Sequence, residues 1–401
     1  MKKIIKSIGG NMKEVKSFTL ISILKCIIYI YFNTFFAIYY FSISNGSILL
    51  FAKYYLIVSL VRLLCYWILS QLGKFNNKLY YLRIGISLMA LCLSMIIVFK
   101  ENVVKYYYLI AIIYGLSYGF YHYPQSILNK TKIKGNKKYN SIIQYCHYTS
   151  GIIVPILLGL FISLYDYFKV SYVIFLFIFA IFLLSYYIND EDYKSKKENM
   201  AHFYKKVKND EVIQRAMILQ FLRGATINGG VLSVVILLYQ IIYFKTPFNI
   251  GVLESALGMF TLLTFIIHTK IKKIELFKNF NIAFLVLITI FLVFLSVKPN
   301  DIILCVCLLI MTISLSLSNY FTDDYIDNTA NKLNVRFHQS EYHLILENIL
   351  NIARFISFVF LFFIGIVGEK SYLCCPLIIS IVPLTMYVIY INKINDKEIK
   401  K

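Results

Sequence analysis

The stretch at 189–210, NDEDYKSKKENMAHFYKKVKND, is the longest polar run in this chain of 401 residues, and it divides the apolar segments six and six. Hydrophobic residues make up 59% of the sequence, and the mean hydropathy of +0.70 is too high for a water-soluble protein of this size. Apolar segments near the ~20 residues that cross a bilayer as a helix recur along the chain. The twelve predicted spans lie at 18–40, 48–72, 81–99, 106–126, 141–164, 170–188, 216–239, 248–267, 280–297, 301–321, 341–367 and 371–391.

Lysine and arginine gather on every second connection between these spans. The connections on one side carry 30 of the 41 basic residues, and those on the other side carry 6. Because basic loops stay in the cytoplasm, this asymmetry predicts a multi-pass protein of the cell membrane with both termini cytoplasmic. The net charge of +21 follows from the same asymmetry, so we expect contact with the anionic lipid bilayer rather than with nucleic acid.

The two halves of the chain share a register. Spans begin near 48 and 248, near 81 and 281, and near 141 and 341, an offset of about 200 residues. Six spans return the chain to its starting side, so the two repeats have the same orientation. The pattern predicts an all-α polytopic membrane protein with 12 transmembrane helices in two pseudo-symmetric six-helix bundles. The predicted parts are an N-terminal bundle at 1–189, a cytoplasmic linker at 190–214 and a C-terminal bundle at 215–401.

Two stretches carry a resemblance to a known family. The second-to-third connection reads LSQLGKFNNK at 69–78, and the fifth span reads Ser141-x8-Ser150-x3-Val154-Pro155-x2-Leu158-Gly159. With the six-and-six division and the charged central loop, the whole chain resembles the major facilitator superfamily. Of that family's G-x3-D-R-x-G-R-K motif, the first stretch keeps only the basic character of two positions, at Lys74 and Lys78. The second is similar to its antiporter motif in small residues and proline, which implies alternating access and export.

The clearest candidate site is a polar stripe in the eleventh span. Its members recur every three or four residues, so they share one face of a helix, and such a face cannot point at lipid. The stripe comprises Ser340, His343, Glu347, Asn351, Arg354 and Ser357. Glu347 is expected either to contact substrate or to close a gate by pairing with Lys25 or Arg223.

Other ionisable and amide side chains inside the predicted spans complete the candidate set. They are Lys25 and Asn33 in the first span, Arg62 in the second, Gln144 and His147 in the fifth, and Arg223 and Asn228 in the seventh. Charges inside a bilayer are costly and usually line a cavity. Cations outnumber anions within the spans, which favours an anionic substrate. His147 is a candidate proton carrier because its side chain titrates near neutral pH, with a packing role as the alternative.

The fourth and tenth spans end in matched polar-aromatic segments, FYHYPQ at 120–125 and YFTDDY at 320–325. Asp323 and Asp324 are expected to form salt bridges with Lys332 and Arg336 at the cytoplasmic surface.

The function predicted from these features is secondary active transport of a small organic molecule, coupled to protons and running in the direction of efflux. Uptake of an organic anion and flipping of a lipid-linked sugar are the alternatives. The sequence contains no P-loop, no HExxH and no nucleophile elbow, so no enzyme activity is expected. The eight cysteines are scattered without metal-type spacing, and we expect a monomer with no metal and no cofactor.

Overall fold

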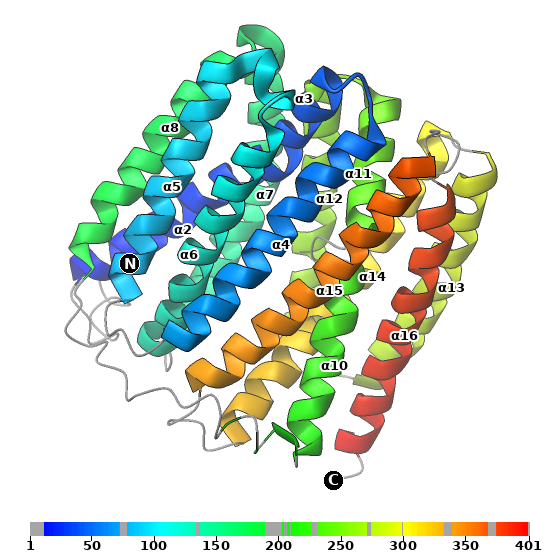
Figure 1. The fold of residues 1–401 in the computed structure, drawn as a ribbon. Helices are drawn as coiled ribbons and strands as arrows, with labels where there is room; N and C mark the ends of the chain where they lie inside the picture. Colours follow the sequence, from blue (N-terminus) through cyan, green and yellow to red (C-terminus); the bar gives the residue numbers. More distant parts are fainter. Residues whose placement is uncertain are drawn as a thin grey trace. The chain divides into compact units, whose positions relative to one another are not determined.

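The computed structural model describes residues 12–72, 78–133, 137–188, 203, 205, 207–208, 210–226, 231–270, 274–298, 300–332, 339–367 and 374–399. This part of the chain is almost entirely helical (Figure 1). The first half contains α2 (Met12–Ile30), η1 (Tyr31–Phe35), α3 (Phe36–Ile43), α4 (Ile48–Leu72), α5 (Lys78–Phe99), η2 (Lys100–Val104), α6 (Tyr107–Ile133), α7 (Lys137–Tyr165), α8 (Tyr167–Leu184) and η3 (Ser185–Tyr187). The second half contains α10 (Glu211–Thr226), α11 (Val231–Phe244), α12 (Pro247–Lys270), α13 (Ile274–Val297), α14 (Asp301–Lys332), α15 (Gln339–Val367) and α16 (Cys374–Ile399).

Eight helices in the described residues are long and apolar enough to cross a membrane. They fall on eight of the twelve predicted spans, and three shorter apolar helices lie at 232–244, 282–297 and 380–391. The predicted span at 106–126 falls on α6, whose second half is rich in polar and aromatic side chains. The protein is therefore a multi-pass helical membrane protein, as the apolar segments predict.

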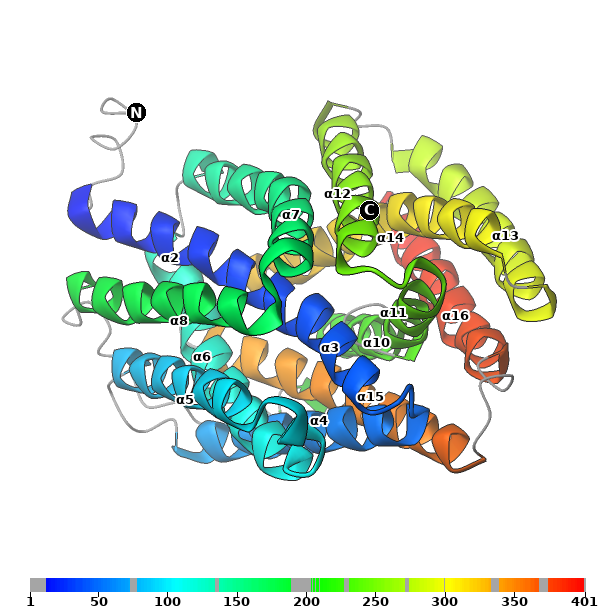
Figure 2. The same ribbon diagram turned by 90° about the horizontal axis from the view of Figure 1, so that it is seen from above.

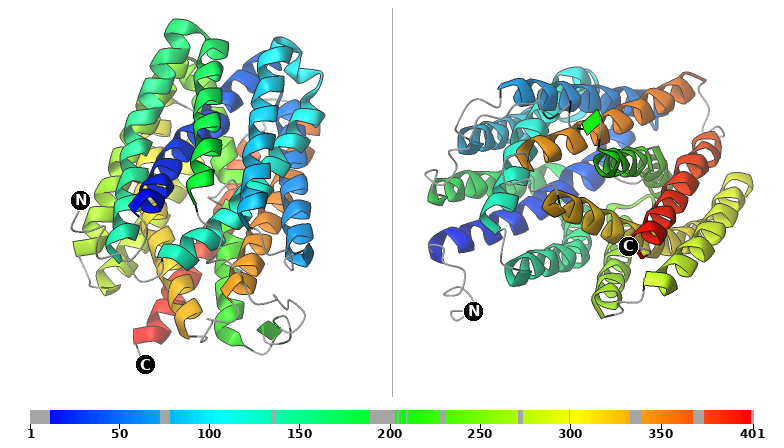
Figure 3. Two further views of the ribbon diagram at one scale, coloured as in Figure 1. Left: turned by 90° about the vertical axis from the view of Figure 1, so that its left-hand side faces the viewer. Right: turned by 90° about the horizontal axis from the view of Figure 1, so that it is seen from below.

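The helices group into two compact units. The first unit comprises 1–46, 60–198 and 246–255, and the second comprises 47–59, 199–245 and 256–401. Within the first unit α5 lies beside α6, and within the second α13 lies beside α16 (Figure 3). Each unit is described separately below.

The first helix that the structure describes, α2, leads into a π-helical segment. Figure 2 shows α2, η1 and α3 following one another without a loop, and η1 is the π-helix at Tyr31–Phe35. The extra residue in such a turn redirects the side chains that follow it. Tyr31 is fully buried there, its hydroxyl lies 2.5 Å from the Ser171 hydroxyl of α8, and its ring stacks on Tyr167. The π-helical turn thus helps to attach the first helix to α8.

Two glycines lie at close contacts between helices. A Cβ on Gly85 of α5 would lie 2.5 Å from the backbone nitrogen of Tyr121 in α6. In the second unit, a Cβ on Gly224 of α10 would lie 2.7 Å from the carbonyl oxygen of Leu350 in α15. Small residues allow backbones to approach this closely in membrane helices. Glycine at these positions brings α6 against α5 and α15 against α10. The helices α6, α10 and α15 carry residues of the candidate site described below.

Replacing Gly224 by alanine should destabilise the protein. The added methyl group meets backbone rather than a flexible side chain, and such overpacking costs about 1–3 kcal/mol. The matched control is Gly151→Ala in α7, where an added methyl group would have nothing within 4 Å of it. There we expect no loss and a gain of up to about 1 kcal/mol from helix propensity. Thermal unfolding of the two purified variants in detergent checks this, and equal melting temperatures would contradict it.

Candidate functional site

A lysine joins the first and fourth helices of the first unit. Lys25 of α2 donates a hydrogen bond from Nζ to Oε1 of Gln125 in α6, at 2.6 Å. The same Nζ lies 3.4 Å from Nδ1 of His122, one turn earlier on α6, and 5.4 Å from the centre of the Tyr121 ring. An ammonium group inside an apolar helix needs such polar and aromatic contacts. They explain why the polar-aromatic segment of α6 lies opposite Lys25.

Arg62 of α4 contacts the same face of α6. Its guanidinium carbon lies 3.5 Å from the centre of the Tyr118 ring, and the Tyr118 ring stacks on His122 with 3.8 Å between the ring centres. Lys25, Tyr118 and His122 also line a cavity of about 20 Å³, which has room for roughly one water molecule. The first unit thus collects two cations and a histidine around one tyrosine.

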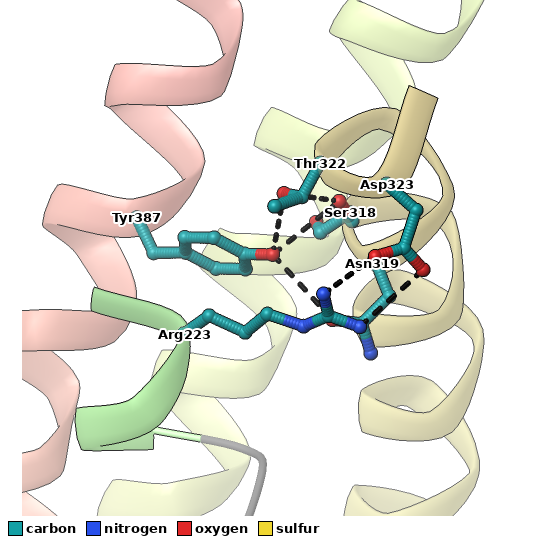
Figure 4. A network of polar contacts seen from close by, with 6 residues as sticks. All are labelled: Arg223, Ser318, Asn319, Thr322, Asp323 and Tyr387. Atoms are coloured by element: carbon teal, nitrogen blue, oxygen red, sulfur yellow. Dashed lines mark hydrogen bonds and ion pairs between the residues drawn. The ribbon is translucent and has the colours of Figure 1, made fainter. Parts of the chain in front are cut away.

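An ion pair joins the corresponding helices of the second unit (Figure 4). Arg223 of α10 donates from Nη1 to Oδ1 of Asp323 in α14 at 2.6 Å, and from Nη2 to Oδ2 at 3.4 Å. The Arg223 side chain is 13% exposed and that of Asp323 is 56% exposed. The pair is therefore desolvated on the arginine side and open on the aspartate side.

A tyrosine from α16 closes this second cluster. The Tyr387 hydroxyl lies 2.7 Å from Oγ1 of Thr322 and 3.4 Å from the carbonyl oxygen of Ser318. It also contacts Oδ1 of Asn319 at 3.5 Å, and its ring is fully buried (Figure 4). The network ties α16 to the turn of α14 that presents Asp323.

The two clusters are spaced alike in the two halves of the sequence. Lys25 and Gln125 are 100 residues apart, and so are Arg223 and Asp323. One link joins α2 to α6, and the other joins α10 to α14. The acceptor is a neutral amide in the first unit and a carboxylate in the second, so the two links differ in charge.

The Asp323 carboxylate pairs with Arg223 of α10, a partner that the sequence analysis did not name for it. The reason is helical periodicity, because Asp323 projects from α14 on the side where α10 lies, more than two turns before the basic residues. The Lys332 side chain and Arg336 lie outside the described residues.

The polar stripe of α15 is buried, as its spacing predicts. His343, Asn351, Arg354 and Ser357 are each less than 10% exposed. Arg354 donates from Nη1 to Oδ1 of Asn351 at 3.1 Å. The Ser357 hydroxyl donates to the carbonyl oxygen of Ala225 in α10 at 3.3 Å. The stripe therefore packs against α10, next to the close contact at Gly224; the Ser340 side chain lies outside the described residues.

Glu347 differs from the rest of the stripe. Its side chain is half-buried and makes no hydrogen bond or ion pair within the described part of the chain, while its carbonyl accepts from Asn351 at 2.9 Å. The carboxylate is close enough to act electrostatically on Arg223, but in this structure the ion-pair partner of Arg223 is Asp323.

The remaining predicted site residues are less closely engaged. His147 is exposed on α7, with Lys25 near enough to act on it electrostatically, and its carbonyl accepts a weak contact from the Cys26 thiol at 3.9 Å. Asn33 donates to the carbonyl of Tyr29 in its own helix. The Gln144 side chain and Asn228 lie outside the described residues. Within the described residues, no group of three or more potential metal ligands occurs.

Sequence reasoning missed four partners in these clusters, namely Tyr118, Gln125, Asp323 in its role toward Arg223, and Tyr387. A signal for two of them was present. Lys25 and Arg223 are matched across the repeats, and so are the segments at 120–125 and 320–325. Combining the two matches would have paired each cation with its own segment. Nothing in the sequence distinguishes Tyr387 from the 33 other tyrosines.

Comparisons with known proteins agree with this architecture. The sequence profile of the Major Facilitator Superfamily matches residues 131–333, which is half of the chain. The chain belongs to the major facilitator superfamily. Membership points to a transporter rather than an enzyme, and no curated protein matches the sequence.

Solved structures of the superfamily are similar in fold over nearly their whole length. A bacterial homologue of the iron transporter ferroportin in an inward-facing state is 12% identical with a TM-score of 0.67, covering 98% of both chains. The nucleoside transporter NupG is 9% identical with a TM-score of 0.67, covering 94% of this chain and 98% of its own. The human organic anion transporter MFSD10 (TETRAN) is 9% identical with a TM-score of 0.62, covering 94% and 99%. At identities this low, the structural similarity establishes a shared fold alone.

Neutralising Asp323 should destabilise the second unit. In Asp323→Asn the buried guanidinium of Arg223 loses its carboxylate, and a charged hydrogen bond of this kind contributes about 1–3 kcal/mol. Removing both charges in Arg223→Gln/Asp323→Asn should recover part of the loss. The control is Glu211→Gln, which removes the exposed pair with Arg215 one helical turn away and should cost less than about 0.5 kcal/mol. Thermal melting of the wild type, the two single variants Asp323→Asn and Arg223→Gln, the double variant and the control measures the coupling, and additive losses in the double variant would contradict it.

Proposed function

We propose that this protein is a secondary active transporter that moves a small organic molecule by alternating access, coupled to protons, with efflux as the favoured direction. The observation that carries the proposal is Glu347. Its carboxylate sits half-buried in a helix of membrane-spanning length, without a hydrogen-bond partner in the described residues and within electrostatic range of Arg223. A carboxylate in such a place can exchange a proton when the nearby charges change.

The same proposal covers the organisation of the chain. We infer twelve spans in two six-helix bundles at 1–189 and 215–401, joined by a cytoplasmic linker at 190–214. The basic connections support a location in the cell membrane with both termini in the cytoplasm. We also infer a monomer.

Two groups in addition to Glu347 suit the step in which proton binding is coupled to a change of contacts. His147 is accessible on α7, and a proton gained there would add a charge near Lys25. Asp323 is more than half exposed while it holds the buried Arg223. A proton on Asp323 would release the arginine, so this ion pair is a second place where proton uptake and a change of contacts coincide.

Uptake of an organic anion is the second candidate. The basic residues around Tyr118 favour it, and one similar structure is an organic anion transporter. A flippase for a lipid-linked sugar is the weakest alternative. Such a flippase would be of the multidrug/oligosaccharide-lipid exporter type, and this chain belongs to another superfamily.

Proton coupling is tested by Glu347→Gln in proteoliposomes that contain a pH-sensitive dye. With ethidium, uridine and benzoate as cationic, neutral and anionic probes, we expect at least one probe to move protons through the wild type. In Glu347→Gln the proton movement should fall at least tenfold, while exchange of the same probe without a gradient continues. Asp327→Asn, which neutralises an exposed carboxylate of α14, is the control. Unchanged proton movement in Glu347→Gln would remove this residue as a carrier.

A further inference from the structure

Arg62 is an arginine whose charge the described structure leaves without a counter-group. Its stacking on Tyr118 is the one side-chain interaction it has in the described part of the chain. Its Nε is buried and has no hydrogen-bond partner there. A buried charged donor without an acceptor is unfavourable by more than a neutral one, so the position is costly unless something accepts from it.

The two terminal nitrogens of the guanidinium, unlike the buried Nε, are not enclosed and make no hydrogen bond within the described residues, so the edge that carries them is open. Arg62 and His122 both lie within 4 Å of the Tyr118 ring centre, too close to share one side of the ring, so Tyr118 lies between them. Stacking uses the flat face of a guanidinium, whereas its N–H donors point outward in its plane. A planar fork of this kind matches two oxygens of a carboxylate or phosphate.

The surroundings of Arg62 are basic. His122, on the far side of Tyr118, is 3.4 Å from the ammonium of Lys25. We refer to Arg62, Tyr118, His122 and Lys25 as the basic row. Two acidic residues of this unit, Glu101 and Asp166, lie in η2 and immediately before α8, outside the row. Coulomb attraction in a partly desolvated site therefore favours an anion over a cation.

The second unit contains a guanidinium whose charge is neutralised. There Arg223 is held by both oxygens of Asp323, so its fork is already occupied by a carboxylate. Arg62 stands in the first unit with the same type of group and no such carboxylate within the described residues. A ligand that brings the missing oxygens would complete the site.

We propose that the basic row binds the oxyanion of an organic anion, a carboxylate or a phosphate, with Arg62 as the bidentate donor. The neighbouring cavity of about 20 Å³ holds no more than about one water, so the organic body does not lie there and the anionic group reaches Arg62 from its open edge. The inference names the substrate class of the proposed transporter and rests on that function for its physiological meaning, but binding can be measured without transport.

The test uses the full-length protein in detergent and measures its thermal stabilisation by added ligands. Benzoate, phenyl phosphate and inorganic phosphate are the anionic probes, and benzylamine and benzyl alcohol are matched cationic and neutral probes. Benzoate, phenyl phosphate or both should raise the melting temperature in a concentration-dependent way, and benzylamine and benzyl alcohol should not. A wild type that no anion stabilises, or that benzylamine stabilises equally, would overturn the proposal.

Variants locate the binding at Arg62. Arg62→Gln should weaken the affinity for the stabilising anion about tenfold or more, and Arg62→Lys, which keeps the charge without the fork, should lose most of it. The matched control is Arg83→Gln. Arg83 also lies over a tyrosine ring, 4.1 Å from the centre of Tyr186, but its guanidinium already donates to the Ser185 carbonyl at 3.2 Å. Its removal should leave anion affinity unchanged.

If Arg62→Gln does not fold, Arg62→Lys alone decides, because wild-type anion affinity in the lysine variant contradicts bidentate binding.

Nanodiscs with and without phosphatidylglycerol separate two sources of the oxyanion. If phosphatidylglycerol competes with the anionic probe in the wild type, and does not compete with the probe binding that remains in Arg62→Lys, the basic row binds a lipid headgroup. If the lipid does not compete in the wild type, the row binds a free organic anion. Anion binding that depends on Arg62, without proton-driven transport, would support the binding site and contradict the proposed transport function. Proton-driven transport without anion binding at Arg62 would support the transport function and contradict the binding site.

Discussion

A positive charge placed inside a membrane-spanning helix has to find acceptors or aromatic faces on another helix, because hydrocarbon supplies neither. Much of the polar structure of this protein follows from that constraint. Lys25 reaches Gln125 and the Tyr121 ring, Arg223 reaches Asp323, and Arg354 reaches Asn351 within its own helix. In the first two cases the contact determines which face of the fourth helix of a repeat turns toward the first.

The same solution is used twice, with a difference in charge. Both links span 100 residues and join equivalent helices, as expected of two related repeats. An amide accepts from Lys25, whereas a carboxylate accepts from Arg223, so the first unit retains positive charge and the second is locally balanced. Duplicated halves that keep a contact but change its charge can assign different tasks to the two contacts, for example ligand attraction in one and proton exchange in the other.

Close helix packing allows these contacts to form. Gly224 lets α10 approach the backbone of α15, which places the Ser357 hydroxyl against the Ala225 carbonyl and keeps Glu347 near Arg223. Gly85 likewise lets α5 approach the backbone of α6. A hydrogen bond of about 3 Å tolerates little displacement, so polar groups on neighbouring helices depend on the small residues beside them.

The sequence by itself determined which segments are helices and which face of α15 is buried, because these properties depend on local composition and on a period of 3.6 residues. It also identified Lys25, Arg62, Arg223 and Glu347 as ionisable groups within the spans. Only the tertiary structure decided their partners. Asp323 pairs with Arg223 of another helix, a partner that its neighbours in the sequence did not indicate, and Arg62 lies over the Tyr118 ring. Partner choice depends on how helices distant in sequence rotate and approach one another, and that information is distributed over the packing of whole helices.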